Sequence, residues 1–513
     1  MRSIDSSPRA LFARARGCLR NSPLPRLLVW LPSRCAFSGP ELLGRIERLS
    51  RALSGAGLSG GRVLAVLSDP LSATLVLPAL WSLDCIPFLA DGRATRPEVD
   101  EMIRRFRPDH LLEDAGGVPS LRPPPLRLRP LPARQPRLSL PRETVLVRTT
   151  SGSTGPPRGV ALSASQMLAD ASNILASLRT PPEWWGLAAV PLTHAFGFST
   201  LLSPLLFHSR PVVMLSQPTP DQFRAALRGR RSFFFPGVPY LFDMLGRARI
   251  PRRDLRRLKL CVSAGAPLPP ETALRFRALS GSPVRNFYGT SECGAIACER
   301  SRRAAAPPGC AGRPMKGIRL SLEKRKGAEG RRPEFPRSGR VLVEGESVAL
   351  GYVGAGARLQ LFRGRFATGD LGKVDSRNRL HLLGRLDRQI NVSGRKVWPA
   401  EVESLFRERR EIREAVAVGI PDAARGEVVA VAVESETEVS VASLLGLCRA
   451  RLSLHKMPKK IQVFRRLPRN ARGKADTARI RELLTRAPSL PEVRCTSPDG
   501  LAKIRAVAPL PRR

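Results

Sequence analysis

The stretch TTSGSTGPPRGV at residues 149–160 combines side chains that could bind an anion. It holds five hydroxyl side chains and three glycines, and its only charged residue is Arg158. Glycines let a backbone approach a ligand closely, and hydroxyls and free N–H groups donate hydrogen bonds to an anion. The stretch therefore predicts a phosphate-binding loop. A flexible surface linker has a similar composition, so this stretch alone leaves both interpretations open.

Other segments decide between these interpretations, because they follow in order the motifs of a known family. They are PLTHAFGF (191–198), SAGAPL (263–268), NFYGTSE (286–292), ATGDLG (367–372), GRLDRQINVSGRKVWPAEVE (384–403) and LPRNARGKADTARI (467–480). With the loop, they resemble the adenylate-forming superfamily, which includes acyl-CoA synthetases and aryl-CoA ligases. The resemblance covers roughly residues 38 to 486. So many motifs in the family's order are far more specific than any one of them.

The resemblance implies that a carboxylate attacks the α-phosphate of ATP, giving acyl-AMP and pyrophosphate. Because two anions must meet, this step depends on positioning and charge neutralisation rather than on a protein nucleophile. The loop would hold the β- and γ-phosphates through Thr150, Ser151, Gly152, Ser153, Thr154 and Gly155. Glu292 would supply a carboxylate to Mg²⁺, which usually takes one or two carboxylates and keeps several waters.

The other parts of the nucleotide are assigned by the same resemblance. Tyr288 would offer its ring to adenine, and a thin wall opposite it would consist of Gly265, Ala266 and Pro267. The residues that follow the tyrosine complete its motif, with the last at the α-phosphate: Gly289, Thr290 and Ser291. Asp370 would accept from the ribose hydroxyls, Arg385 would donate to the sugar or phosphate, and His194 would lie near the acyl substrate.

Lys474 is implied as the catalyst of adenylation, since a compact ammonium can approach both the carboxylate and the α-phosphate. Composition supports this role: eleven of the 86 basic residues are lysines, so a random basic position would be lysine only about one time in eight. Arg158, in contrast, stands where the family usually has lysine. Arginine can bind phosphate through two hydrogen bonds, so we interpret the change as tolerated. Because the exchange of lysine for arginine is not geometrically conservative, a loss of activity is the alternative interpretation.

The second implied step is attack of the coenzyme A thiol on acyl-AMP. In the family a small C-terminal domain rotates between the two steps. Asp387 matches the hinge position, and the thiol channel would be lined by Ser393, Gly394 and Arg395. Two alternatives stay open: delivery to the phosphopantetheine of an acyl carrier protein, and a catalytically impaired member that acts as a binding protein.

The acyl substrate is less well defined by the sequence. The segments PLLFHSRPVVML (204–215) and SFFFPGVPYLFDML (232–245) could form apolar pocket walls, which would favour a fatty or aryl acid. The same segments could equally be ordinary core, and the sequence does not separate the two.

Alternating helix and strand patterns up to Leu383 predict an α/β fold. The resemblance implies a large N-terminal adenylate-forming domain of layered α/β subdomains, followed by a small, mobile α+β domain. We place these domains at residues 1–384 and 385–486, with a basic, proline-rich tail at 487–513. Amphipathic spacing predicts helices at 38–53 and 399–412, and apolar runs predict strands at 62–68, 415–420 and 427–435. The proline-rich interval 121–141 is expected to be an irregular crossing.

The net charge of +43 suggests a nucleic-acid or anionic-membrane partner, but 75 arginines are scattered through every segment without a recognition motif. We therefore expect no specific nucleic-acid binding. No apolar run is long enough to span a bilayer. Nine cysteines without paired spacing indicate reduced thiols and a cytoplasmic location, although the first 35 residues also resemble a mitochondrial transit peptide.

Overall fold

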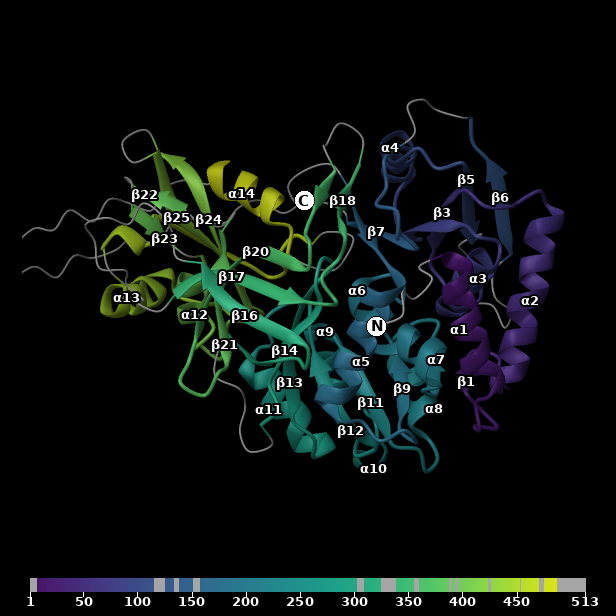
Figure 1. Cartoon of the computed structure of the whole chain (residues 1–513). Helices are drawn as coiled ribbons and strands as arrows, with labels where there is room; N and C mark the ends of the chain where they lie inside the picture. Colours follow the sequence, from purple (N-terminus) through teal and green to yellow (C-terminus); the bar gives the residue numbers. More distant parts are fainter. Residues whose placement is uncertain are drawn as a thin grey trace, which may run out of the picture. The chain divides into compact units, whose positions relative to one another are not determined.

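The computed structural model describes residues 7–114, 125–132, 138–150, 157–301, 309–323, 338–354, 359–386, 390–392, 395–397, 399–422, 426–452, 454–469 and 475–486. The chain divides into two compact units, Met1–Asp387 and Arg388–Arg513. Both units contain helices and strands (Figure 1). The mixed α/β architecture agrees with the predicted fold class.

The first unit contains an eight-stranded sheet with the strand order β19-β18-β8-β7-β4-β3-β5-β6. Its strands are β3 (Arg62–Leu67), β4 (Ile86–Asp91), β5 (His110–Asp114), β6 (Leu126–Pro130), β7 (Leu146–Thr150), β8 (Arg158–Leu162), β18 (Gly351–Val353) and β19 (Gln360–Leu361). The four strands β7, β4, β3 and β5 are parallel, and the outer pairings are antiparallel. The antiparallel strands β7 and β8 contain the first and last residues of the predicted phosphate loop.

A thirteen-stranded sheet lies in the same unit, with the order β16-β17-β20-β21-β15-β14-β13-β12-β11-β9-β10-β1-β2. Its strands are β1 (Leu28–Trp30), β2 (Cys35–Phe37), β9 (Trp185–Ala188), β10 (Val212–Met214), β11 (Phe233–Gly237), β12 (Leu258–Ser263), β13 (Val284–Thr290), β14 (Gly294–Cys298), β15 (Cys310–Pro314), β16 (Ile318–Glu323), β17 (Ser338–Gly345), β20 (Arg365–Val374) and β21 (Leu380–Arg385). From β1 to β13 neighbouring strands are parallel, and from β13 to β16 they are antiparallel.

Most helices of the first unit lie between strands of its two sheets, and α1 precedes the first strand. They are α1 (Pro8–Arg20), α2 (Gly39–Gly55), α3 (Pro70–Ser82), α4 (Arg96–Phe106), α5 (Ala164–Leu178), α6 (Ala195–Gly197), α7 (Ser203–His208), α8 (Pro220–Leu227), α9 (Pro239–Arg247), α10 (Arg252–Leu255) and α11 (Pro270–Ser280), with one π-turn at Phe198–Leu202. Side chains cap several of these helices: the Ser38 hydroxyl accepts from the Glu41 N–H, and the Glu41 carboxylate accepts from the Ser38 N–H. No helix in the described part of the chain has both the length and the apolar character of a membrane span.

The second unit is built on a five-stranded sheet of β22 (Ile390–Val392), β23 (Arg395–Val397), β24 (Glu414–Asp422), β25 (Gly426–Glu434) and β26 (Lys460–Phe464). Its helices are α12 (Pro399–Phe406), α13 (Val441–Arg451) and α14 (Thr477–Arg486), with a 3₁₀ turn at Leu454–Lys456. The strands predicted at 415–420 and 427–435 are confirmed. The helix predicted at 399–412 ends at Phe406, where the chain turns and buries Ile412 in the same core.

Two further sequence-based expectations are corrected by the structure. Helices and strands do not alternate up to Leu383, because the chain from β13 to β21 forms antiparallel strands without an intervening described helix. The proline-rich interval is not wholly irregular either, since β6 pairs with β5 along Leu126–Pro130. The other predicted elements of the first unit, the helix at 38–53 and the strand at 62–68, correspond to α2 and β3.

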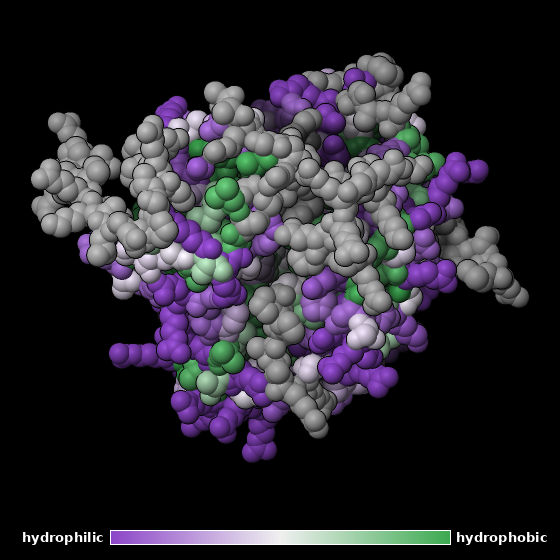
Figure 2. All heavy atoms as spheres, turned by 90° about the vertical axis from the view of Figure 1, so that its left-hand side faces the viewer, coloured by the Kyte–Doolittle hydropathy of each residue, from purple (hydrophilic) through white to green (hydrophobic). Residues whose placement is uncertain are grey.

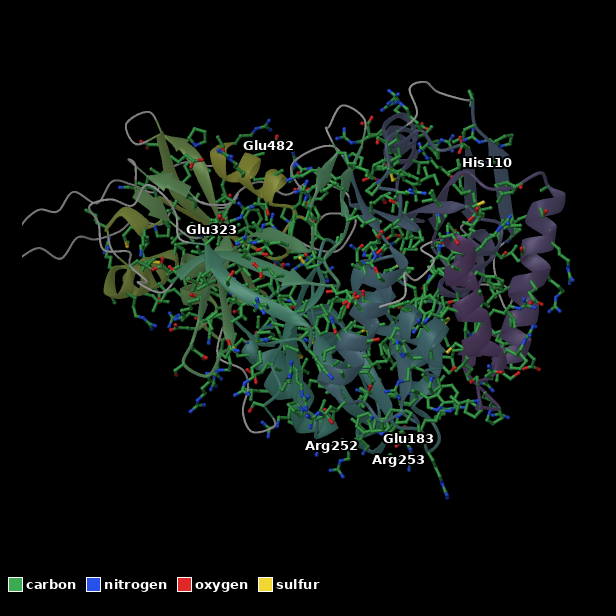
Figure 3. All side chains as sticks on the ribbon, in the orientation of Figure 1. His110, Glu183, Arg252, Arg253, Glu323 and Glu482 are labelled. Atoms are coloured by element: carbon green, nitrogen blue, oxygen red, sulfur yellow. The ribbon has the colours of Figure 1, made fainter. Side chains whose placement is uncertain are left out.

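Charged side chains are present on both units, among them Arg252 and Arg253 on α10 and Glu482 on α14 (Figure 3). The face drawn in Figure 2 is predominantly hydrophilic, and its hydrophobic residues lie in separate small areas. Large exposed apolar side chains in the described residues are few: Tyr240, Leu274, Leu359, Leu361 and Leu454. Within the described part of the chain, these five side chains are spread over separate elements rather than gathered in one sequence segment.

Candidate functional site

The phosphate loop predicted at 149–160 joins β7 to β8. Thr150 at the end of β7 pairs with Arg158 at the start of β8, and the Thr149 hydroxyl donates to the Leu89 carbonyl at 3.0 Å. The side chain of Thr150 and the residues Ser151, Gly152, Ser153, Thr154 and Gly155 lie outside the described residues. The exposed Arg158 is described, and its guanidinium carbon lies 5.3 Å from the centre of the Tyr352 ring.

Glu292 lies in the turn between β13 and β14. Its Oε1 accepts a hydrogen bond of 2.6 Å from the Tyr352 hydroxyl, and its backbone carbonyl accepts from the Ala349 N–H at 2.7 Å. The Thr290 hydroxyl accepts from the Cys293 N–H at 3.2 Å, which stabilises the turn. These contacts fix both ends of the predicted metal-binding residue. Gly289 belongs to the end of β13, and Ser291 lies in the turn.

The described residues contain no group of three or more His, Cys, Asp or Glu side chains that could hold a metal by themselves. This fits Mg²⁺ in a nucleotide site, because Mg²⁺ is usually bound by one or two carboxylates together with phosphates and waters. A single half-buried carboxylate with one oxygen engaged by Tyr352 suits that mode of binding.

The side chains predicted for adenine and ribose contact each other. The Tyr288 hydroxyl donates to Asp370 Oδ2 at 2.6 Å, and Arg385 Nη1 lies 3.8 Å from Asp370 Oδ1. The contact between Asp370 and Arg385 follows from the strand pairing, since Asp370 in β20 is directly opposite Arg385 in β21. Burial and the neighbouring Asp370 raise the pKa of Tyr288, so the phenol stays protonated and continues to donate.

Gly265 in the predicted adenine wall has a φ of +86°, in the region that favours glycine. A Cβ at this position would meet only a Val238 methyl at 3.7 Å, so backbone conformation rather than space requires the glycine. Gly265, Ala266 and Pro267 are all exposed, directly after β12. An exposed turn whose side chains are absent or small allows a flat ligand to lie close to the backbone.

His194 is held by a partner that the sequence did not reveal. Its Nε2 lies 2.7 Å from Asp91 Oδ2, at the end of β4. Arg93 binds the same carboxylate, with Nη2 at 2.6 Å from Oδ2 and Nε at 3.0 Å from Oδ1. Burial alone would raise the pKa of Asp91, but the hydrogen bonds from His194 and Arg93 hold it well below its usual range. The histidine therefore contacts a permanent carboxylate, 103 residues away in the sequence.

The apolar segments considered as pocket walls are mostly core. Phe235 and Phe242 are fully buried, with ring centres 5.1 Å apart, and Phe242 packs edge-on against Phe276. Phe207 is also buried and lies against Trp81. These side chains stabilise the sheet, and most of them cannot contact an acyl chain without a rearrangement.

The predicted residues of the second unit are only partly covered by the structure. Lys474, the hinge residue Asp387, and the channel residues Ser393 and Gly394 lie outside the described residues, as does the side chain of Arg395. The loop that carries Lys474 is described at both its ends. Arg469 and Ala475 form a β-bridge, and the Asp476 N–H donates to the Pro468 carbonyl at 2.8 Å.

Arg469 is itself anchored by two carboxylates. Its Nη2 lies 2.8 Å from Glu414 Oε2 and 2.9 Å from Glu434 Oε2, and the Glu434 side chain is 2% exposed. Glu434 also accepts from the Leu467 N–H at 3.0 Å. The described residues on both sides of the segment that carries Lys474 are therefore held by a β-bridge, and Arg469 is also held by ion pairs. The sequence motifs did not indicate these contacts.

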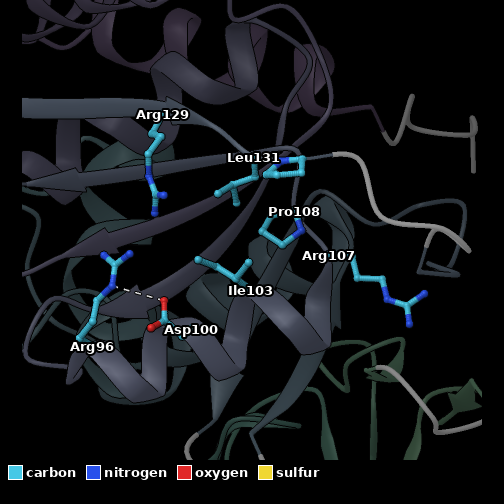
Figure 4. Close-up of a pocket in the computed structure, with 8 residues that line it drawn as sticks. Arg96, Asp100, Ile103, Arg107, Pro108, Arg129 and Leu131 are labelled. Atoms are coloured by element: carbon cyan, nitrogen blue, oxygen red, sulfur yellow. Dashed lines mark ion pairs between the residues drawn. The ribbon is translucent and has the colours of Figure 1, made fainter.

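A cavity of about 180 Å³ lies away from these residues, between α4 and β6 (Figure 4). Arg96 and Arg129 point toward each other across it, Arg96 pairs with Asp100 at 3.3 Å, and Arg107 points away. None of its lining residues belongs to the predicted site. We therefore assign the cavity no part in the reaction.

Comparison with known families matches both units. The family described as AMP-binding enzyme matches residues 25–353, and the family described as AMP-binding enzyme C-terminal domain matches residues 401–474. The first match covers more than half of the chain.

Similar proteins of known activity extend over most of the sequence. Indoleacetate–CoA ligase of Aromatoleum aromaticum is 28% identical, over 89% of this chain and 96% of that protein. Feruloyl-CoA synthase of an Amycolatopsis species is 29% identical, over 87% and 94%. Long-chain-fatty-acid–CoA ligase of Bacillus subtilis is 26% identical, over 68% of this chain but only 63% of its own length.

Among solved structures, ATP-bound MatB from Rhodopseudomonas palustris is similar, with a TM-score of 0.78 and 23% identity over 94% of this chain and 99% of that one. The o-succinylbenzoate CoA synthetase MenE from Bacillus subtilis, solved with its acyl-adenylate intermediate, has a TM-score of 0.75 and 22% identity, over 95% of this chain and 99% of that one. At these identities the two structures establish a common fold.

Proposed function

Because the chain belongs to the AMP-binding enzyme family and is an AMP-forming acid–thiol ligase of the acyl-CoA synthetase type, we propose that it activates a fatty or aryl carboxylic acid with ATP and Mg²⁺ and transfers the acyl group to coenzyme A. The observation that carries the site assignment is a connected set of contacts in the first unit. Asp370 contacts Tyr288, Tyr288 leads along one strand end to Glu292, and Glu292 is joined through Tyr352 to Arg158.

In the first step a carboxylate oxygen of the acid forms a bond to the α-phosphorus of ATP, and the bond to the β-phosphate bridging oxygen breaks. Tyr288 and Asp370 would hold the nucleoside, while Arg158 and the loop hydroxyls would hold the departing pyrophosphate. Mg²⁺, when bound at Glu292, would neutralise phosphate charge. Lys474 would bring its ammonium to the two reacting anions, as a compact charge can.

In the second step the thiol sulfur of coenzyme A bonds to the acyl carbonyl carbon, AMP leaves, and the thiol proton is released. Arg395 and Gly394 would lie along the entering pantetheine arm. His194 would lie near the acyl group, and Asp91 would fix the orientation of its ring by engaging Nε2. That leaves Nδ1 as the nitrogen able to face a ligand.

An aryl or fatty acid is the favoured substrate class. The similar proteins named above act on indoleacetate, ferulate and long-chain fatty acids, all of which join an apolar body to one carboxylate. His194 with Asp91 adds a polar point beside an otherwise apolar region, where Phe196 packs against Phe287 with ring centres 5.2 Å apart.

Pyrophosphate release with a panel of carboxylic acids tests this proposal. Release with an aryl or fatty acid, followed by thioester formation when coenzyme A is added, is the expected result. If no acid in a panel of short, long and aromatic acids releases pyrophosphate, the proposed reaction is wrong and the binding-protein alternative takes its place.

An acyl carrier protein is a second candidate for the acceptor. The net charge of +43 favours an acidic partner, because complementary charge accelerates encounter. Acyl transfer to a phosphopantetheinylated carrier protein, compared with coenzyme A at equal thiol concentration, decides between them. A carrier preference should weaken as salt is raised, since surface charges are screened.

A further inference from the structure

Tyr352 joins two side chains of the proposed nucleotide site that come from different elements. Its hydroxyl donates to Glu292 Oε1 at 2.6 Å, and the guanidinium of Arg158 lies over its ring at 5.3 Å from the centroid. Glu292 is the proposed Mg²⁺ carboxylate, and Arg158 is the basic residue of the phosphate loop. One phenol thus contacts a carboxylate and a guanidinium that would each face the phosphates.

The ring of Tyr352 is fixed by its surroundings. Tyr352 in β18 is paired with Val160 in β8, the strand that begins at Arg158. The backbones of Tyr352 and Arg158 therefore belong to neighbouring strands. Phe362 packs edge-on against the ring at a centroid distance of 5.0 Å, and Phe366 does so at 6.1 Å. Aromatic packing of this kind restricts the ring to one position and therefore fixes the direction of its hydroxyl.

The segment that leads to Tyr352 also holds the main chain of the metal-site turn. The Ala349 N–H donates to the Glu292 carbonyl at 2.7 Å, and the Ser347 hydroxyl donates to the Cys293 carbonyl at 3.0 Å. Both the backbone and the carboxylate of Glu292 are therefore positioned from residues 347–352.

We propose that Tyr352 is a positioning residue that sets the Glu292 carboxylate toward Mg²⁺ and the Arg158 guanidinium toward the pyrophosphate group of ATP. The hydroxyl engages Oε1, so Oε2 would be the oxygen available to Mg²⁺. The ring face holds Arg158 through a cation–π contact. This inference rests on the function proposed above and adds a residue that the family-wide motifs of the sequence did not include.

The two contacts can be separated by substitution. Tyr352→Phe removes the hydroxyl but keeps the ring, so it should affect only the metal-dependent part of ATP binding. Tyr352→Leu removes both, so it should also weaken the contact with the pyrophosphate group. Tyr240→Phe is the matched control, because Tyr240 lies on α9 with 65% exposure.

Isothermal titration of ATP into the full chain, without any acid, measures both effects. Each variant is titrated once with Mg²⁺ and once with EDTA. For Tyr352→Phe we expect unchanged affinity in EDTA and a loss of about tenfold in the gain that Mg²⁺ gives, as expected for a hydrogen bond to a charged group. For Tyr352→Leu we expect a further loss of about two- to tenfold in EDTA. The control should match the unsubstituted chain in both.

The outcomes separate the inference from the function on which it rests. If the unsubstituted chain binds no ATP, the proposed function fails. If it binds ATP with a gain from Mg²⁺ and Tyr352→Phe shows the same gain, Tyr352 does not position Glu292 and the inference is wrong. A loss for Tyr352→Phe that is equal in Mg²⁺ and in EDTA also overturns it, because general damage to the site would not depend on the metal.

Discussion

Replacing Asp91 by asparagine removes the charge that holds His194 and leaves the shape of the side chain almost unchanged. In the structure Asp91 Oδ2 lies 2.7 Å from His194 Nε2, and the carboxylate is 20% exposed. An amide can still accept the backbone hydrogen bond from the Arg93 N–H at Oδ1, which measures 2.9 Å. Its NH₂ group can also face His194. Because that group is a donor, it would favour the ring tautomer in which Nε2 carries no proton, whereas the carboxylate favours the tautomer in which Nε2 is protonated. The variant therefore tests the charge and orientation that Asp91 gives to the histidine.

The loss of stability expected for Asp91→Asn depends on how strongly each contact of Asp91 stabilises the folded state. The Arg93 side chain is 53% exposed, so its ion pair with Asp91 is screened by solvent and contributes little. The His194 contact is more sheltered, and a hydrogen bond to a charged group is worth about 1.5–3 kcal/mol before exposure is considered. Allowing for partial exposure, we expect a loss of about 1–2 kcal/mol in the free energy of unfolding, which lowers the Tm of the unit Met1–Asp387 by about 1–2.5 °C.

The dependence on pH gives this prediction its sign. The pKa of Asp91 is lowered in the folded state, so its stabilisation is complete above the unfolded pKa of about 4 and is lost as pH falls toward the folded value. The difference in Tm between the original chain and Asp91→Asn should therefore be constant from about pH 8 to 5.5 and shrink below about pH 4. Differential scanning calorimetry across this range measures it.

Activity provides the second readout, and a matched substitution provides the control. If His194 acts near the acyl group, Asp91→Asn should lower kcat for pyrophosphate release by about tenfold, with the KM for ATP unchanged. Asp84→Asn is the control: Asp84 is exposed, precedes the same strand and has a φ of +60°, which asparagine tolerates. An equal Tm at neutral pH, or a difference that grows as the pH falls, would refute the role given to Asp91.

Three further predictions concern other parts of the proposed site. Lys474→Ala should abolish acyl-AMP formation yet leave thioester formation from supplied acyl-AMP largely intact, and equal loss of both steps in separate half-reaction assays would contradict a lysine used in only one of them. Arg469→Leu should lower acyl-AMP formation by about tenfold and leave Tm within a few degrees, because it loosens the base of the lysine loop between Glu414 and Glu434; an unchanged rate would show that the loop needs no such base. Gly265→Ala should raise the KM for ATP, because alanine disfavours a φ of +86° by about 1–2 kcal/mol, whereas Gly281→Ala, at +74° and with open space around it, should cost similar stability without changing that KM.

Residues of the proposed nucleotide site can be named from the sequence where a local motif contains them, but not where distant elements meet. NFYGTSE and ATGDLG indicated Tyr288 and Asp370 by resemblance, and the structure joins them by a hydrogen bond that no spacing could reveal. The same limit explains why Asp91 and Tyr352 were missed. Each acts through a partner at least 60 residues away, and neither stands in a chemically distinctive stretch.

Fold prediction succeeded and failed for a similar physical reason. The capped helix α2 and the apolar strand β3 are specified by their own residues, through a capping box and a continuous β-branched and leucine run. The long antiparallel region from β13 to β21 was misjudged as alternating with helices, because burial there does not always follow the period of two. Strand β20 buries Thr368, Leu371 and Gly372, at spacings of three and four residues that resemble a helix. Helix α12 ended early because Ile412 reaches the core through a turn, which periodicity does not encode.

A lysine in this arginine-rich chain can indicate a site that fits only a small cation, whether or not that site is catalytic. Lys456 is one of the eleven lysines, and its side chain is 2% exposed with its ammonium 2.8 Å from Glu401 Oε1. It lies in a closely packed turn of the second unit, where a compact charge fits and a broad guanidinium would need more room and more acceptors. A lysine in this arginine-rich chain can therefore reflect restricted space in a core, with no part in catalysis. The argument for Lys474 consequently depends on the motif around it, and its rarity supports only the requirement for a small cation at that position.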